Sequence, residues 1–363
     1  MEATTTGVER VAVGGDSVMS SLEFLEVEIT LKSPAILASR VTGSGYLKPL
    51  NYIPGSTLRG ALLTALYYQG YVNQDHLKEE WKEPKLLVSP AHPLTETGQR
   101  TLPATPADFE CKVCGRRISM LHELVSALKG KRYDSIDLSA ECPQHGPMKP
   151  LYALHVYRGV RGLETYSHNV FYAASTAINK AMCTAMKGML FNYEAIAANT
   201  RFWARLAVPV TIADKMPRAF EVYIGRGRSR GFGRAEVKIV RESTAPGAEL
   251  SNVFIALSSL LPLRELKWGP CALTINVAYG RPFRVLSGWD MVADLHRPIV
   301  TAIRQGAVLK ANVVCSDNKS LREFIALLAH GGVPLKHGYT WITGFNVVVP
   351  VEEYLDLRGD GRV

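Results

Sequence analysis

The sequence predicts an α+β protein with two ferredoxin-like units, of which the second is degenerate. Residues 22–34 alternate apolar and polar side chains, as in a half-buried strand, and a helical pattern follows after a long loop. A later region is rich in strand patterns and poor in helical ones. We therefore expect a flexible N-terminal tail at 1–21, a first unit at 22–240 with an insertion at about 103–150, and a second, reduced unit at 241–363.

The first unit opens with a strand, a long loop and a helix. The strand pattern ends at Pro34. In GSTLRGALLTALYYQG (55–70), Ser56 is the expected N-cap and Gly70 the expected stop of a helix with an apolar stripe of leucines. Strand, loop and helix in this order form the first half of a ferredoxin-like unit.

The middle of the chain divides into an insertion and further strands. Residues 90–150 are rich in Pro, Thr and charge. After them, KGMLFNYEAI (187–196) and RFWARLAVPVTI (201–212) predict two strands joined by AANT. Residues 214–224 are expected to be helical or irregular, and AEVKIV (235–240) predicts a strand.

The second unit follows a plausible linker at 241–251. CALTINVAY (271–279) and GAVLKANVV (306–314) predict strands, and KSLREFIALLAHGG (319–332) predicts a helix. A last strand is expected within TWITGFNVVVP (340–350). The two units resemble each other loosely, and no internal repeat is visible.

Composition and charge favour an intracellular protein with a polyanionic partner. The 363 residues are 47% hydrophobic and 21% charged, with a net charge of +9 and a sequence pI of 9.2. No apolar run is long enough to cross a bilayer, and the N-terminus lacks a signal-peptide pattern, so we expect a cytoplasmic protein without membrane association. Between Glu28 and Asp75 there is no acidic residue, whereas four basic residues are present: Lys32, Arg40, Lys48 and Arg59.

Three of the six cysteines cluster in the insertion. Cys111 and Cys114 form one x2 pair, Cys142 and His145 form another, and 27 residues separate the pairs. Four soft ligands from two knuckles suit tetrahedral zinc, and a fully protein-ligated ion is structural. The alternative is two buried cysteines and an unrelated surface histidine. The scattered cysteines Cys183, Cys271 and Cys315 are expected to be buried, small apolar residues.

The segment GRGRSRGFGR (225–234) holds four glycines, four arginines and no acid. Glycines allow a close approach of the backbone, successive N–H groups form an anion-binding nest, and arginines add forked phosphate contacts. The segment therefore suits a phosphodiester backbone. The alternative is a disordered RGG-like segment or a plain exposed turn, although strand patterns on both sides favour an ordered turn.

Two motifs together resemble a known family. YIPGSTLRGAL (52–62), followed far downstream by GRGRSRGFGR, is similar to the CRISPR-associated RAMP superfamily, whose folds are RRM-like. Further resemblance lies in TAINKAMCTAMKGMLFNYEAIAANTRFWARLAV (176–208) and SGWDMVADLHRPIVTAIRQGAVLKA (287–311), which are similar to the handle-capping Cas-five-group subunits (Csx-ten type) of type III-D complexes. The likeness covers most of residues 22–349. Asn346 departs from the pattern, because a glycine is expected there.

The resemblance implies a non-catalytic subunit that binds the 5′ handle of the guide RNA (crRNA). It also implies docking to a Cas-ten-type large subunit and to backbone RAMP subunits, with indirect contact to target RNA. The predicted metal ligands are those of the insertion. The predicted RNA contacts come from the helix entry, the glycine–arginine segment and the basic first loop: Gly55, Ser56, Arg59, Gly225, Arg226, Gly227, Arg228, Arg230, Gly231, Phe232, Gly233, Arg234, Arg40 and Lys48.

Catalysis is not expected. RAMP backbone subunits that cut RNA use an acidic residue after the first strand, and the equivalent loop here, 33–55, has none. His155 and His168 are expected to be structural histidines with satisfied hydrogen bonds. The alternatives are a metal-independent RAMP endoribonuclease that processes precursor RNA, a type III backbone RAMP subunit, or a stand-alone basic zinc protein.

Overall fold

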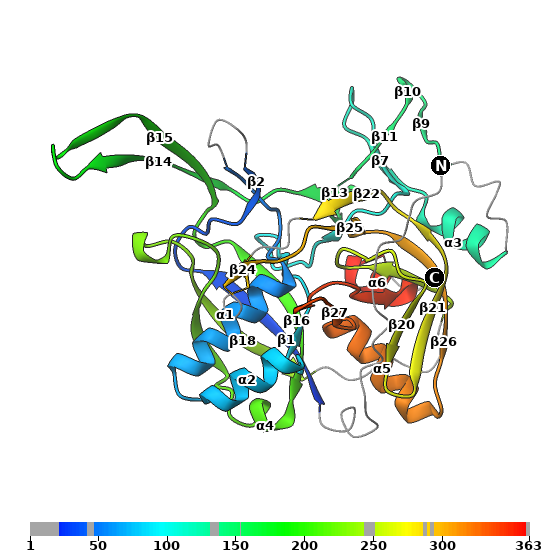
Figure 1. Cartoon of the computed structure of the whole chain (residues 1–363). Coiled ribbons are helices and arrows are strands. Elements are labelled where there is room, and N and C mark those ends of the chain that lie inside the picture. Colours follow the sequence, from blue (N-terminus) through cyan, green and yellow to red (C-terminus); the bar gives the residue numbers. More distant parts are fainter. Residues whose placement is uncertain are drawn as a thin grey trace.

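The computed structural model describes residues 22–41, 47–130, 138–152, 154–242, 251–285, 289–290 and 294–360. Strands outnumber helices in this part of the chain, so the predicted mixture of the two is confirmed (Figure 1). The tail expected at 1–21 lies outside the described residues, as does most of the expected linker.

The first sheet has the strand order β17-β18-β1-β16-β4, and β5 also pairs with β16. All of these pairs are antiparallel. Its strands are β1 (Leu22–Leu31), β4 (Leu87–Val88), β5 (His92–Pro93), β16 (Arg201–Pro209), β17 (Ala219–Tyr223) and β18 (Arg234–Glu242). β17 corrects the expected irregular stretch at 214–224. Phe220 and Val222 alternate with exposed residues there, so one face of the strand enters the core.

Helix α1 (Gly55–Tyr68) covers one face of this sheet together with the short α4 (Val210–Ala213). Leu58, Leu62 and Leu66 are fully buried against the inward side chains of β1. Pro54 occupies the N-cap without a side-chain hydrogen bond, so the prediction that Ser56 caps the helix is wrong. Proline has a fixed φ that suits a helix start and needs no cap of its own. A second helix, α2 (Gln74–Lys82), follows on the surface.

The second sheet has the order β20-β21-β26-β19-β29 and lies on the other side of helix α5 (Asn318–His330). α5 packs Phe324, Leu327 and Leu328 into an apolar cluster shared by both sheets. Helices α3 (Leu121–Lys129) and α6 (Val351–Arg358) contribute to the cluster on the opposite face of β19. The strands are β19 (Val253–Ala256), β20 (Glu265–Trp268), β21 (Cys271–Tyr279), β26 (Val308–Val314) and β29 (Val348–Pro350).

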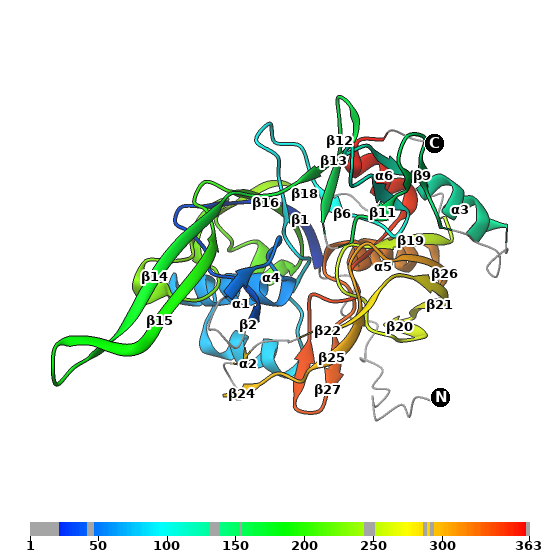
Figure 2. The same ribbon diagram turned by 90° about the horizontal axis from the view of Figure 1, so that it is seen from above.

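A long hairpin projects from the body in both views (Figure 1, Figure 2). Its strands are β14 (Val170–Asn179) and β15 (Thr184–Ile196), and β15 continues into a sheet with β3 (Leu47–Pro49) and β2 (Ala38–Val41). The two strands predicted on either side of AANT therefore exist, but β15 and β16 belong to different sheets.

The insertion forms small sheets around a helix. β7 (Asp108–Glu110) pairs with β8 (Arg117–Ser119) and β11 (Lys149–Pro150), and β9 (Glu141–Cys142) pairs with β10 (Gly146–Pro147). A neighbouring sheet joins β6 (Leu102–Pro103), β12 (His155–Gly159) and β13 (Gly162–Tyr166). Three short hairpins complete the second unit: β22 (Pro282–Val285) with β25 (Val300–Ile303), β23 (Trp289–Asp290) with β24 (Leu295–His296), and β27 (Leu335–His337) with β28 (Thr340–Ile342).

The scattered cysteines match the prediction only in part, because Cys271 is buried as expected. Cys271 and Cys315 form a disulfide across β21 and the end of β26, with their Cα atoms 4.2 Å apart. Cys183 is exposed at the turn of the β14–β15 hairpin. Adjacent strands bring the first two cysteines together, which sequence separation could not indicate. Within the described ranges, no helix is both long and apolar enough to cross a membrane.

Candidate nucleic-acid interface and metal centre

The glycine–arginine loop is an ordered turn between β17 and β18. Ile224 N–H donates to the Gly233 carbonyl, and a short 3-10 turn spans Arg228–Arg230. Gly231 has a φ of 86°, in the left-handed region that favours glycine. Arg226, Arg228 and Arg230 are exposed. The loop thus holds its cations at the surface on a defined backbone.

The same loop contacts the segment that follows β1. Arg226 N–H donates to the Ile36 carbonyl over 3.1 Å, and Gly233 N–H donates to the Pro34 carbonyl over 2.8 Å. A Cβ atom at Gly225 would overlap the Ile36 carbonyl oxygen. The structure therefore brings the two acid-free, basic stretches of the sequence together.

The four arginines of the loop have different partners. Arg228 lies over the rings of Tyr223 and Tyr68, with its guanidinium carbon 4.3 and 5.9 Å from their centroids. Arg234 pairs with Glu221, with Nη2 2.6 Å from Oε1.

Arg230 lies 4.9 Å from the Tyr193 centroid and donates to its hydroxyl over 3.1 Å. Arg226 makes no side-chain hydrogen bond or ion pair within the described part of the chain. Among the described residues, Arg226 and Arg228 thus both keep all their side-chain donors for a ligand, and Arg226 also has no ring contact there. The stacked arginines keep donors at the guanidinium edge.

The loop meets the base of the β14–β15 hairpin. Phe232 contacts the ring of Phe171 edge to face, with centroids 6.4 Å apart, and Tyr193 packs nearby. Arg40 and Lys48 pair in register between β2 and β3, in the sheet that β15 extends. The tyrosines at 68, 193 and 223 were not among the predicted site residues. Tyr68 and Tyr193 lie far from the loop in the sequence, and all three tyrosines occupy ordinary helix or strand positions. No local sequence pattern therefore identified them as site residues.

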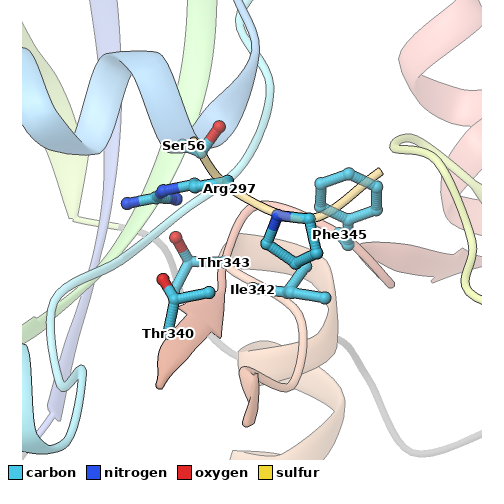
Figure 3. Close-up of a pocket in the computed structure, with 7 residues that line it drawn as sticks. Ser56, Arg297, Thr340, Ile342, Thr343 and Phe345 are labelled. Atoms are coloured by element: carbon cyan, nitrogen blue, oxygen red, sulfur yellow. The ribbon is translucent and has the colours of Figure 1, made fainter. Parts of the chain in front are cut away.

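The entry of α1 has a different environment from the loop. Gly55 is buried against Val88 of β4 and against Gly344. A hollow of about 10 Å³ beside it has room for about one water molecule. Figure 3 shows Arg297 between Ser56 and the Thr340–Thr343 pair at this hollow, which Ile342, Phe345 and Pro298 also line.

Arg59 is engaged within the protein. Its Nη2 is 2.6 Å from Glu80 Oε2, and its Nε donates to the Leu86 carbonyl. No hydrogen bond or ion pair links the α1 entry to the glycine–arginine loop in the described residues. An RNA contact at Gly55, Ser56 or Arg59 therefore stays a prediction, and these residues have packing partners within the chain.

The second glycine turn, at 343–346, tolerates the departure at Asn346. Asn346 has a φ of 58°, and its Oδ1 accepts a hydrogen bond from Leu261 N–H over 2.9 Å. Asparagine adopts the left-handed region more readily than most residues. The turn is therefore formed without the expected glycine, but it is buried.

The predicted metal ligands lie together. The side-chain ligand atoms of Cys111, Cys114, Cys142 and His145 are all within 4.8 Å of one another. Sγ of Cys114 is 3.8 Å from Sγ of Cys142, and Nδ1 of His145 is 3.5 Å from that sulfur and 3.7 Å from Sγ of Cys111. Bonds of about 2.0–2.3 Å to a tetrahedral ion place neighbouring ligands about 3.5–3.8 Å apart. The cluster could therefore hold a metal ion.

The protein environment favours thiolate at Cys142 but not at Cys114. The backbone hydrogen bond of Arg116 lowers the pKa of Cys114, but the hydrogen bond with Cys111, burial and the hydrogen bond with Cys142 together raise it above its usual value. The backbone N–H of Gln144, followed by the ring of His145, lowers the pKa of Cys142 to about 6. Thiolate is the form that ligates metals. An aromatic and apolar floor of Phe109, Ala140 and Met148 packs against Cys111 and Cys142.

Two buried histidines form a polar pair that sequence reasoning missed. His92 Nδ1 lies 3.0 Å from His155 Nε2, next to Trp203 and Tyr52. Burial lowers the pKa of His92 to about 3 and lowers the pKa of His155. His155 Nδ1 and His168 Nδ1 have no hydrogen-bond partner. The expectation that both histidines have all their hydrogen bonds satisfied is therefore only partly met. Burial removes this pair from contact with solvent or RNA.

Comparison with known families decides the relationship. The model of the RAMP superfamily matches residues 28–236, which is 209 of the 363 positions. The chain belongs to the RAMP superfamily. The matched region of this RAMP protein runs from β1 to the start of β18 and includes the α1 entry, the insertion and the glycine–arginine loop.

Solved structures resemble this RAMP chain only in part, and no curated protein matches it. A chain of a type III-B Cmr-beta complex bound to cognate target RNA is 15% identical with a TM-score of 0.47, over 78% of this chain and 86% of that one. A chain of a Csm3–Csm4 subcomplex of the type III-A interference complex is 11% identical with a TM-score of 0.35, over 80% and 94%. Cmr4 of Pyrococcus furiosus is 13% identical with a TM-score of 0.27, over 61% and 100%. Family membership rests on the sequence match alone.

Proposed function

We propose that this RAMP protein is a non-catalytic RNA-binding subunit of a type III CRISPR effector complex, in the cytoplasm, that binds the 5′ handle of the guide RNA. Its further partners are a Cas-ten-type large subunit and backbone RAMP subunits, and it meets target RNA through the complex. The observation that carries the proposal is the ordered glycine–arginine loop, where Arg226 has no side-chain partner in the described chain.

The chemistry of the loop fits single-stranded RNA. Arginine forks suit phosphates, and aromatic rings beside them offer stacking surfaces for bases. Most backbone N–H groups of the loop donate within the chain, so the arginine side chains supply most of the free donors. Phe171, Tyr193 and Phe232 supply such rings at the base of the hairpin. The sequence resemblance to handle-capping subunits supports the handle as the part of the RNA that is bound.

Two ferredoxin-like units are the fold we infer for this function. The first sheet contains the strand order β18-β1-β16-β4, and the second contains the order β29-β19-β26-β21. If the four strands of each set are numbered as they occur in the sequence, both sets have the order 4-1-3-2. The second unit has α5 before its last strand and a β20–β21 hairpin where a first helix would stand, which supports its description as degenerate.

Absence of catalysis is also a proposal. The loop at 33–55 carries no carboxylate to hold a metal or activate a nucleophile. His92, His155 and His168 are buried, so they have no access to a phosphodiester. Incubation of the pure protein with repeat RNA tests this: intact RNA is expected with or without magnesium. Cleavage that follows the protein through purification and disappears in a point variant would contradict it.

We infer that the metal of the Cys3His cluster is structural zinc, because three sulfurs and one imidazole nitrogen suit it and leave no open position. One zinc per chain is expected. Cys111→Ser should lose the metal and loosen residues 103–150, and Cys183→Ser, the exposed cysteine of the hairpin turn, should keep it. Metal analysis of the two variants checks this, and unchanged metal content in Cys111→Ser would refute the assignment.

The central test removes the charges of the loop. Replacing Arg226, Arg228 and Arg230 with glutamine should weaken guide-RNA binding at low salt and lower the salt slope by up to about 2 units, at about 0.7 for each phosphate that the protein no longer neutralises. The matched control replaces three exposed lysines that pair with acids elsewhere: Lys78, Lys267 and Lys319. Equal binding of the arginine variant and the wild type across the salt series would sink the proposal.

A further inference from the structure

The small sheet β11–β7–β8 of the insertion has one charged and one apolar face. Lys149, Glu110 and Arg117 are directly opposite one another in register. Residues that are opposite in antiparallel strands point to the same side. Their neighbours Phe109 and Ile118 point the other way and pack in the apolar cluster beneath the metal ligands.

A cavity of about 230 Å³ opens beside this charged face. This volume exceeds that of several water molecules, at about 30 Å³ each, and falls below the roughly 300 Å³ of a typical drug-sized site. A single small polyatomic group fits such a space. Residues of β8, α3, β12, β13 and the end of α6 line it, and its polar lining is Arg117, Ser119, His122, Arg158, Arg358 and Asp360.

The carboxylates around the cavity are already paired. Glu110 accepts Arg117 Nη2 at 2.6 Å. Asp108 accepts Arg358 Nη1 at 3.1 Å. Asp360 pairs with Arg358 and lies 3.6 Å from Arg158 Nη1. The negative charge at the site is therefore matched before any ligand enters.

Cationic donors remain without acceptors. Nε of Arg117 is buried and has no hydrogen-bond partner. Lys112 and Lys149 are exposed and have no carboxylate within ion-pair distance among the described residues.

We propose that this cavity binds a phosphate group. The Arg117 Nε–H supplies the buried donor, Ser119 and His122 supply polar contacts, and the unpaired Lys112 and Lys149 supply further charge on the same insertion. Forked arginine donors match the oxygens of phosphate. The group belongs either to a small phosphate compound or to a strand of RNA. This site uses the insertion and α6, so it is separate from the glycine–arginine loop at the other end of the molecule (Figure 1).

Calorimetric titration of the zinc-loaded full chain with inorganic phosphate, at constant ionic strength set with sodium chloride, tests the site. Saturable binding is expected in the wild type. Arg117→Gln removes a charge-assisted bond and should weaken binding about tenfold. The double variant Lys112→Gln, Lys149→Gln should weaken it as well, without touching the Glu110 pair. Lys129→Gln, an exposed lysine paired with Glu352, and Arg226→Gln in the loop should retain wild-type affinity.

A second arm uses a short single-stranded RNA with inorganic phosphate as competitor. RNA binding that Arg117→Gln weakens, and that phosphate displaces, supports the site and identifies an RNA strand as the source. Phosphate binding without such an RNA effect supports the site with a small phosphate compound. Metal content, measured for each variant, shows whether the insertion is intact. No saturable phosphate binding, or wild-type affinity in both Arg117→Gln and the double lysine variant, overturns the proposal. Neither result depends on the loop.

Discussion

The turn at 225–233 and the turn at 343–346 both place glycines at positive φ, but only the first keeps its polar side chains at the surface. In the first turn, Arg226, Arg228 and Arg230 are exposed. In the second, Thr343 and Asn346 are buried, and Gly344 lies against Gly55 at the entry of α1. Glycine thus permits close backbone approach in both turns. In the first turn the close approach is to Ile36 and Ile224, and the arginines between these glycines stay exposed.

The largest effect is expected from a side chain in the buried turn. At Gly344, with φ 74°, a Cβ atom would lie 2.6 Å from Ser56 N and 2.8 Å from Gly55. Gly344→Val should therefore lower the free energy of unfolding by about 4 kcal/mol, from backbone strain and overpacking together. Urea unfolding measures this. Gly338→Val, at a positive φ with open space around it, is the control and should cost about 1–2 kcal/mol. Equal losses would mean that the two units are not packed through this turn.

The stability of the region around the buried turn at 343–346 should also depend on pH. His92 lies near this turn, because Leu257 links to both His92 and Val347. Its pKa is about 3 in the folded state and about 6.5 when unfolded, so the unfolded state binds the proton first as pH falls. Its contribution is complete above pH 6.5 and is lost toward pH 3, with about 2 kcal/mol lost by pH 5.

Unfolding in urea at about pH 7.5 and about pH 5 checks this loss of stability. His76→Gln, which removes an exposed histidine of α2, is the control and should keep the full pH dependence. Stability that is constant over this range would show that folding does not lower the pKa of His92.

The exposed turn should respond to a side chain through binding rather than folding. Gly231 has a φ of 86°, and a Cβ atom added there would meet no other atom within 4 Å. Gly231→Val should lose only about 1–2 kcal/mol of stability but weaken RNA binding about tenfold, because the backbone could no longer reach one phosphate. Filter binding measures the RNA affinity, and urea unfolding measures the stability. At Gly233 a Cβ atom would overlap the Ile224 carbonyl oxygen, so Gly233→Val should instead impair folding. Unchanged RNA binding in Gly231→Val would mean that RNA does not approach this backbone.

The smallest effect separates two arginines of the same loop. Arg226→Gln should lower the salt slope of RNA binding by about 0.7, since its charge has no partner in the described chain. Arg234→Gln should leave the slope nearly unchanged, because Arg234 already pairs with Glu221. Binding measured across a salt series compares the two variants. A larger change in Arg234→Gln would show that RNA displaces Glu221.

Local patterns predicted much of the fold. The alternation in 22–34 and the leucine stripe after Gly55 correspond to β1 and α1, because strand and helix periodicities are properties of adjacent residues. The paired x2 spacings were enough to expect the ligand cluster, since each knuckle is a local turn. β17 was missed because a short edge strand carries only two core positions, Phe220 and Val222.

The partners of individual side chains depended on the order of strands. Cys271 and Cys315 are 44 residues apart and meet because β21 and β26 are neighbours. His92 and His155 meet across two sheets, and neither has a sequence signal beyond its type. Of the four arginines in the loop, the sequence could not indicate which would pair with Glu221 or stack on Tyr193.

The sequence by itself determined the strand–helix start of the first unit, the four residues that could ligate a metal, and a glycine-rich loop that carries four arginines. Each rests on short local patterns, and the metal ligands rest on two such patterns 27 residues apart. Only the tertiary structure decided that the loop lies against the segment after β1, that Gly344 closes on Gly55, and that the insertion encloses a cavity with α6. These contacts join residues far apart in the chain, and they form because burial of apolar faces fixes which sheets and helices are neighbours.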